Sequence, residues 1–180
     1  ETIHREPGHI VLFAWWDDFI DAPYVVNHYF QDIATDSYEL GLTRVLYATI
    51  GSEVQAELRR FEHFTVKENH PSHVASGVVS EAGDLELHLF YDRDRYTVTF
   101  DSQGGSAVPS VTVRYGDTIE ADRPTRDGYR FEGWWTGAGK TGTQLTKDVP
   151  IAATMTVHAA WSPNPYVVTF NTAGGWDGDA

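Results

Sequence analysis

The chain has 180 residues, which is enough for one ordinary domain or two small ones. Its composition is 41% hydrophobic and 13% aromatic, as in a folded protein, and the absence of cysteine excludes disulfides and thiol chemistry. The formal net charge of −13 argues against nucleic-acid partners and anionic membranes, and no apolar run reaches the roughly 20 residues needed to insert into a bilayer.

The first half of the chain predicts short strands separated by turn residues. Alternation of apolar and polar residues is clearest at 24–32, and residues 38–54 read as a strand, a turn and then a further strand or short helix. The predicted strands of this half lie within 10–15, 24–32, 38–54, 59–66, 73–80 and 84–94. Many β-branched and aromatic residues favour this assignment.

The second half continues in the same way. The predicted strands lie at 96–100, 110–117, within 122–136 and at 154–161. Single helical turns are expected at most near 119–121 or 146–149. The fold class predicted for the whole chain is therefore mainly β, built from small modules, with little helix.

One strand and its turn are written twice in the chain. YTVTFDSQGG at 96–105 returns as YVVTFNTAGG at 166–175, and TVHAAW at 156–161 resembles IVLFAW at 10–15. A fixed repeat of this kind is typical of tandem modules. We therefore expect the end of a preceding repeat at 1–16, a complete repeat at 96–161 and the first strand of a following repeat at 166–180.

The complete repeat resembles a known family. An Asp-x-x-Gly-Gly turn, a Gly-Tyr-x-Phe-x-Gly-Trp strand and a strand that closes on Ala-Trp cover 96–161 and look like the Listeria–Bacteroides repeat, also called the internalin B-repeat. The usual Lys before the final Trp is replaced here by Ala160. The resemblance implies a β-grasp-like module that occurs in tandem on bacterial surface proteins and carries no catalytic residues.

Residues 24–95 resemble a second kind of surface module. YVVNHYFQD, ENHPSHVASGVV and LHLFYDRD are similar to the mucin-binding-protein (MucBP-like) repeats that often neighbour B-repeats. Mucin or glycan binding is implied by this analogy alone.

The histidines offer one candidate site. The loop ENHPSH places His70 and His73 near Glu68, and a metal ion would need a third ligand in defined geometry. A solvated loop without metal is the interpretation that we favour. Clustered Asp residues at 17–18 and 177–179 are read as turns, since the Glu that completes a calcium loop is missing.

The tryptophans offer another candidate. Trp134, Trp135 and Trp161 could stack on sugars, although a small module also needs large aromatic residues in its core. Strict alternation places Phe131 and Trp134 on opposite sides of their strand. We expect Phe131 and Trp161 in the core and one of Trp134 and Trp135 outside.

The remaining residues and motifs offer a candidate interface and a turn but no catalytic site. Trp15 and Trp176, in the terminal segments, are further candidates for an interface surface. GAGKTGT at 137–143 joins two strands and does not open a helix, so it is read as a turn and not as a phosphate loop. No nucleophile elbow is present.

These features predict a non-enzymatic stalk or adhesin segment of an extracellular protein on the bacterial cell surface, without cofactor or metal. One alternative is a filament subunit that exchanges strands of its incomplete terminal repeats with other copies. Another is a module that binds mucin or other glycans. The expected partners are neighbouring repeats, other copies or surface glycans, with no nucleic acid and no membrane insertion.

Overall fold

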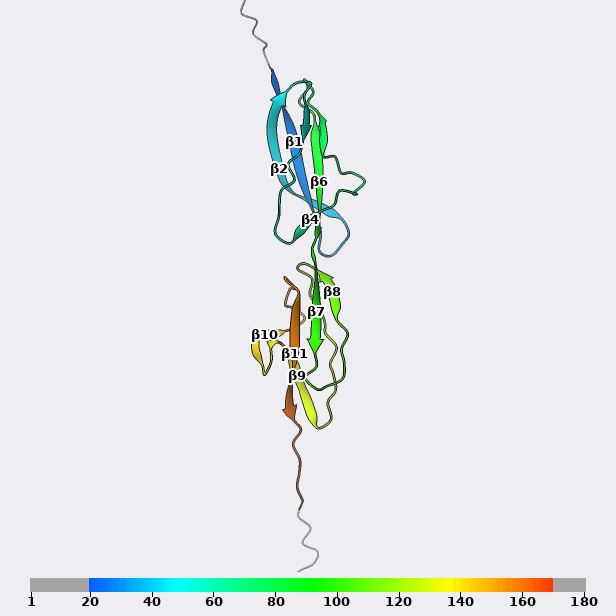
Figure 1. The fold of residues 1–180 in the computed structure, drawn as a ribbon, viewed down its shortest axis with the longest axis vertical. Helices are drawn as coiled ribbons and strands as arrows, with labels where there is room; N and C mark the ends of the chain where they lie inside the picture. Colours follow the sequence, from blue (N-terminus) through cyan, green and yellow to red (C-terminus); the bar gives the residue numbers. More distant parts are fainter. Residues whose placement is uncertain (1–19, 170–180) are drawn as a thin grey trace, which may run out of the picture. The chain divides into compact units, whose positions relative to one another are not determined.

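The computed structural model describes residues 20–169 of the chain. Within these residues the secondary structure consists of eleven strands and no helix (Figure 1). The prediction of a mainly β protein is confirmed. The single helical turns expected near 119–121 and 146–149 are not formed, and the second of these segments instead closes a tight turn in which the Val149 amide donates to the Thr146 carbonyl.

The residues group into two compact units. Unit 1 contains the described residues up to 30 together with 38–60 and 66–91, and unit 2 contains 31–37, 61–65 and 92–169. Each unit has its own sheet.

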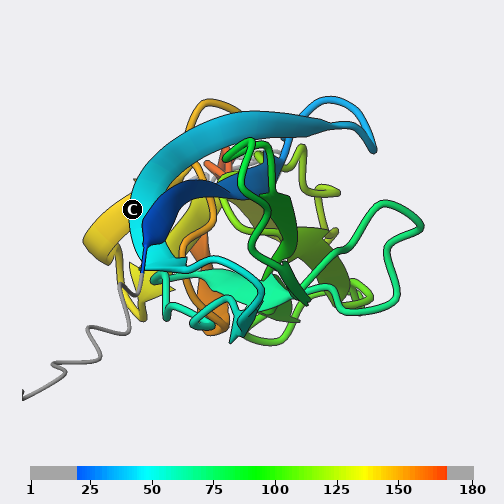
Figure 2. The same cartoon turned by 90° about the horizontal axis from the view of Figure 1, so that it is seen from above.

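The sheet of unit 1 has the strand order β2-β1-β6-β4. These strands are β1 (Asp21–Gln31), β2 (Tyr38–Thr49), β4 (Phe64–Val66) and β6 (Glu86–Arg93), and a second, two-stranded sheet pairs β3 (Glu53–Gln55) with β5 (Ser76–Val78). β2 is a long edge strand that curves strongly along its length (Figure 2). The predicted turn between 38 and 54 lies at Ile50–Gly51, where Gly51 has a φ of 83°.

The core of unit 1 follows from alternation in β1 and β6. Tyr24, Val26 and His28 point to one face of β1 and are buried, as are Leu87 and Leu89 of β6. Because β1 and β6 pair in parallel, these residues come together on one side of the sheet.

The sheet of unit 2 has the strand order β10-β9-β11-β7-β8. Its strands are β7 (Arg95–Asp101), β8 (Val111–Arg114), β9 (Tyr129–Gly137), β10 (Thr141–Leu145) and β11 (Met155–Pro163). β9 pairs antiparallel with β10 and β11, β8 pairs antiparallel with β7, and the central pair β7 and β11 is parallel. GAGKTGT spans the turn between β9 and β10, as predicted.

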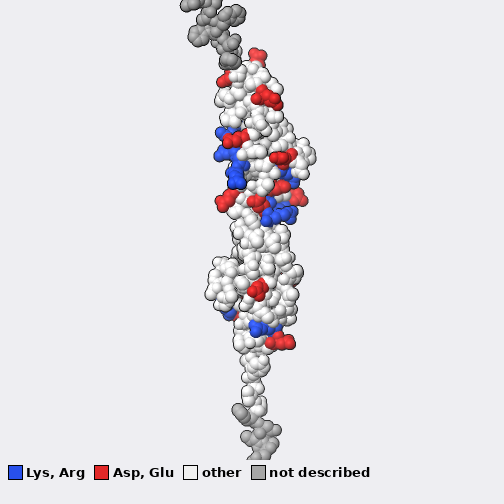
Figure 3. Space-filling view, viewed as in Figure 1, with Lys and Arg blue, Asp and Glu red and all other residues white. Residues whose placement is uncertain are grey.

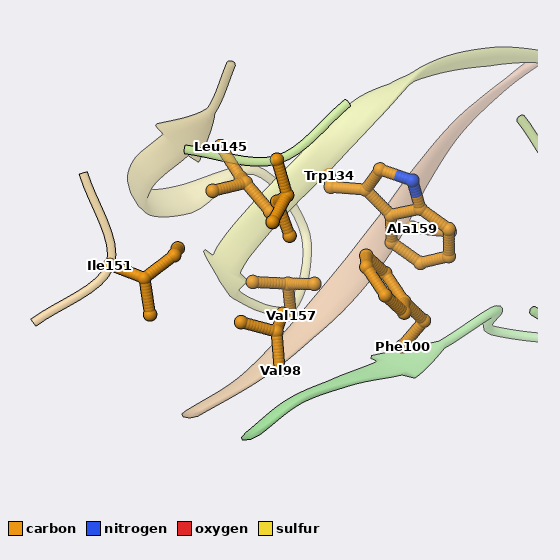
Figure 4. Packing of buried hydrophobic residues seen from close by; sticks show 8 residues of the cluster. Val98, Phe100, Trp134, Leu145, Ile151, Val157 and Ala159 are labelled. Atoms are coloured by element: carbon orange, nitrogen blue, oxygen red, sulfur yellow. The ribbon is translucent and has the colours of Figure 1, made fainter. Parts of the chain in front are cut away.

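The core of unit 2 lies against the central strands of this sheet. Figure 4 shows Val98 and Phe100 of β7 turned toward Val157 and Ala159 of β11, with Trp134 of β9 beside them. Leu145 and Ile151 close the same cluster. The core therefore joins the first and the last strand of the repeat.

Candidate functional site

A β-bulge in β9 determines which way the side chains of the aromatic motif GYRFEGWW point. Ala160 and Trp161 are adjacent in β11, but they pair with Gly133 and Phe131, so Glu132 is an extra residue in β9. Phe131 and Trp134 therefore lie on the same face, and their rings meet edge to face with centroids 5.4 Å apart. The expectation of opposite sides was wrong, because strict alternation does not hold across a bulge.

Trp134 is consequently a core residue. Its side chain is 3% exposed, and its indole Nε1 donates to the carbonyl oxygen of Asp122 at 2.9 Å. This burial corrects the ligand-stacking role considered for Trp134. Trp135, on the other face, is half-buried, and its Nε1 has no hydrogen-bond partner. Phe131 and Trp161 pack at the margin of the core, as expected.

The bulge also creates a polar cluster on the outside of unit 2. The carboxylate of Glu132 accepts hydrogen bonds from Ser162 at 2.7 Å, Arg130 at 2.6 Å and Lys140 at 3.3 Å. These bonds, that of Ser162 first, lower the pKa of Glu132 to about 2. The cluster fixes the bulged residue in place and leaves its carboxylate ionised, so it stabilises the fold and offers no general acid near neutral pH.

The Asp-x-x-Gly-Gly turn at 101–105 fits closely around Trp161. The Asp101 carboxylate accepts from the Gln103 amide, Gly104 has a φ of 86°, and the Trp161 indole donates to the Ser102 carbonyl at 2.9 Å. A Cβ at Gly105 would lie 2.4 Å from the Trp161 ring. The second glycine of the motif is therefore required by packing, and the first by backbone conformation.

The ENHPSH loop folds onto the sheet of unit 1. The His70 ring stacks on Phe90 with a centroid distance of 3.7 Å, and Tyr29 stacks on Phe90 at 4.8 Å. His73 is half-buried, and its Nδ1 has no hydrogen-bond partner. Among the described residues, no group of three or more His, Cys, Asp or Glu side chains could hold a metal ion. The stacking gives His70 a packing role.

An exposed apolar stripe lies on β2, and the sequence interpretation did not single it out. Leu40, Val45 and Tyr47 are 55%, 56% and 69% exposed. The Thr43 hydroxyl of β2 donates to the side chain of Asn27 on β1. Val45 and Tyr47 follow Thr43 at intervals of two residues, so they lie on the same face of the sheet as Thr43 and Asn27. The sequence signal for this stripe is the run of apolar residues interrupted by polar ones in LGLTRVLYAT at 40–49. Leu40 lies on the opposite face by the same alternation, so we refer to Val45 and Tyr47 as the β2 stripe.

A pocket of about 420 Å³ opens in unit 2 beside the bulge. Its walls come from segments 119–123, 131–134 and 145–147, and both basic and acidic side chains line it, including Arg123, Lys147 and Glu120. No serine or histidine is among the residues that line the pocket. On the face of the chain drawn in Figure 3, acidic and basic side chains are likewise interspersed.

A histidine is buried in the core of unit 1. His28 is 1% exposed, and its Nδ1 lies 3.0 Å from the Tyr91 hydroxyl. Burial lowers the pKa of His28 below 6.5, and the nearby guanidinium groups of Arg59 and Arg44 lower it further. The unfolded chain therefore binds a proton here more readily than the folded chain does.

This difference predicts an acid-sensitive unit 1. The contribution of His28 to stability is fully present above its ordinary pKa of 6.5 and is lost progressively as the pH falls below that value. We expect urea unfolding of unit 1 to show a smaller loss of stability between about pH 7.5 and about pH 5 in His28→Gln than in the unchanged chain. Equal pH dependence in both proteins would contradict this assignment.

The pairing of the strands also determines where the chain enters and leaves each unit. In each unit the first long strand and the last long strand are parallel neighbours: β1 with β6, and β7 with β11. The chain therefore enters each unit at one end of the sheet and leaves at the opposite end. We call these two pairs the terminal ladders.

The repeat in unit 2 is similar to a known repeat domain. Residues 96–160 match the Listeria-Bacteroides repeat domain, which confirms this part of the resemblance. The MucBP-like resemblance of 24–95 stays a prediction. Trp15 and Trp176, and most of the terminal segments expected to be partial repeats, lie outside the described residues.

Curated relatives extend the similarity beyond this repeat. In Evansella cellulosilytica, a "Putative Gly-rich membrane protein" is 31% identical over 139 residues, which is 69% of this chain and 16% of that protein. A "Putative membrane protein" of the same organism is 29% identical over 157 residues, 77% of this chain and 24% of the relative. Internalin H of Listeria monocytogenes is 35% identical over 83 residues, 45% of this chain and 15% of the relative.

The chain thus spans a quarter or less of each of these relatives. Two of the relatives carry membrane protein in their names, and the third is an internalin. In the part of this chain that the structure describes, no helix is long and apolar enough to span a membrane.

Proposed function

We propose that this chain is a non-enzymatic repeat segment of a bacterial cell-surface protein and that it acts as a spacer, or stalk, for a more distant part of that protein. The match of 96–160 to a repeat domain and the similarity to an internalin support a surface location. One structural observation carries the spacer role, namely the parallel terminal ladder of each unit.

The relative direction of the first and last strands determines at which end of a module the chain leaves. An antiparallel pair of first and last strands would return the chain to the end at which it entered. A parallel pair instead advances the chain by the length of the sheet. β11 has nine residues, which corresponds to about 30 Å at the rise of a strand.

A replacement experiment tests the spacer role. In a surface protein that carries this segment, deletion of 96–161 should bring a distal epitope closer to the cell, as measured by super-resolution imaging, without changing ligand binding by the distal part in solution. Insertion of an unrelated module of equal end-to-end length should restore the distance and the adhesion of the cells. If the replacement restored the distance but not the adhesion, the repeat would have a role beyond that of a spacer.

The β2 stripe favours a second candidate function, the binding of glycans. Exposed tyrosine rings stack on the apolar faces of sugars, and contiguous exposed apolar surface often marks a binding site. Oligosaccharides released from mucin should shift NMR signals of β2 residues, and Tyr47→Ala should abolish those shifts. Tyr166→Ala is a matched control, since Tyr166 is also exposed (78%) and belongs to unit 2. Unchanged spectra in the presence of the sugars would exclude this candidate.

The filament alternative depends on strand exchange by 1–16 and 166–180. Most of these residues lie outside the described part of the chain, and the alternative remains a prediction.

A further inference from the structure

The terminal ladders have a consequence that goes beyond spacing. In a protein held at both ends, tension reaches each unit through its first and its last strand. In unit 2 the force acts at the start of β7 and at the end of β11, which are opposite ends of a parallel pair. The two strands are therefore pulled along their own axes in opposite directions.

We propose that each terminal ladder is a shear clamp, and that the units resist mechanical load much better along the chain direction than in any direction that peels the two strands apart. In shear, the hydrogen bonds of the ladder carry the load together and must break almost at once. In peeling, they break one after another, so that each step needs little force. Forced unfolding is governed by the unfolding barrier, which the direction of pulling changes without any change in equilibrium stability.

Both clamps lie inside their sheets. In unit 2 the ladder runs from Val98 opposite Met155 to Asp101 opposite His158, with β8 on one side and β9 on the other. In unit 1 it runs from Val25 opposite Glu86 to Phe30 opposite Tyr91, between β2 and β4. The loaded strands are therefore not edge strands that could be stripped from the sheet.

Side-chain hydrogen bonds reinforce the ladder of unit 2 at both ends. At the end where β11 begins, the Thr97 amide donates to the Thr154 hydroxyl at 3.2 Å. At the other end, His158 Nδ1 lies 3.1 Å from the Asp101 carboxylate, and the Trp161 indole donates to the Ser102 carbonyl. These bonds join the two strands and resist sliding of one along the other.

The ladder of unit 1 carries comparable bonds. The Tyr29 hydroxyl on β1 lies 3.2 Å from Nδ1 of His88 on β6, and His28 on β1 meets the Tyr91 hydroxyl on β6. The two bonds lie on opposite faces of the sheet, because neighbouring residues of a strand alternate. Two units with different sequences thus share the same arrangement.

Burial shields one face of each ladder from water, and in unit 2 the other face, which carries Thr99 and Thr156, is exposed. Val98 and Val157 of unit 2 are fully buried, as are Leu87 and Leu89 of unit 1. A hydrogen bond in a dry environment cannot be exchanged stepwise for one to water, and it is electrostatically stronger there. Simultaneous rupture of such bonds sets a high barrier.

Single-molecule force spectroscopy on the whole chain can test this inference directly, because the chain has no cysteine and introduced thiols are unique handles. The pair Arg95→Cys and Asn164→Cys pulls the β7–β11 ladder in shear. The pair Arg95→Cys and Ala153→Cys pulls from the end where both strands begin and peels the ladder. All three positions are exposed, and both proteins share one handle.

At equal loading rate we expect the shear pair to unfold unit 2 at a severalfold higher force than the peeling pair, although urea unfolding of the two unloaded proteins should be the same. His158→Leu should lower the shear force and leave the peeling force unchanged, since peeling begins at the other end of the ladder. Equal forces in the two directions, or a higher peeling force, would overturn the inference. The force experiment measures resistance to load, whereas the deletion experiment measures the distance that the segment spans. A negative result in the force experiment would therefore leave the spacer role unaffected, and a negative result in the deletion experiment would leave the shear clamp unaffected.

Discussion

Trp134→Ala is expected to destabilise unit 2 by about 3–5 kcal/mol, which is the usual cost of removing a large aromatic side chain from a core. Trp134 is 3% exposed and packs against both Phe100 and Phe131. Its loss would open a cavity between β7, β9 and β11 and would leave the Asp122 carbonyl without its indole donor. Urea unfolding followed by NMR signals of unit 2 residues measures the effect.

The adjacent residue is the matched control. Trp135→Ala removes the same side chain from the other face of the same strand, where the ring is only half-buried. We expect its cost to be less than half of that for Trp134→Ala. A larger cost for Trp135→Ala would mean that the bulge at Glu132 is misplaced and that strict alternation describes β9 better.

Gly105→Ala should destabilise the same unit by about 1–3 kcal/mol, as overpacking in a tightly filled site does. The added methyl would lie 2.4 Å from the Trp161 ring and 3.1 Å from the Thr125 carbonyl oxygen. The ring cannot easily move away, because its Nε1 is bonded to the Ser102 carbonyl and Arg126 lies over it. The change in free energy of unfolding is again the quantity to measure.

A double-mutant cycle separates this clash from other effects of alanine. Trp161→Phe removes the part of the ring that the methyl would meet, so Gly105→Ala should cost less in that background than in the unchanged chain. Additive costs at Gly105 and Trp161 would show that the clash is not the cause.

Much of the fold could be predicted because local pattern and final structure agree. The alternation in 24–32 and 96–100 corresponds to β1 and β7, and the run at 154–161 corresponds to β11. The same alternation places His28 on the face of Tyr24 and Val26, so its burial could have been predicted as well. The Gly-Gly turn was recognised as a turn, but its contact with Trp161 depends on residues about 55 positions apart.

The remainder depends on pairing between distant strands. The bulge at Glu132 is visible only in the register of β9 against β11, and a shift of one residue reverses the face of every later side chain. For this reason Trp134 lies in the core and not on the opposite face. Likewise, the parallel pairing of β1 with β6 joins segments about 60 residues apart, and no local pattern predicts it.

The spacer role and the shear clamp both require that each unit passes the chain from one end of its sheet to the other. The most direct test is a pulsed EPR distance in the full chain, with spin labels on the two cysteine pairs used for force measurement. Because Val98 lies opposite Met155 in the parallel ladder, residues 95 and 164 are about twelve strand residues apart along it. We therefore predict a distance of about 40 Å between residues 95 and 164 and a much shorter distance between residues 95 and 153. Similar distances for the two pairs would mean that β7 and β11 are not parallel, and both the spacer and the shear clamp would have to be abandoned.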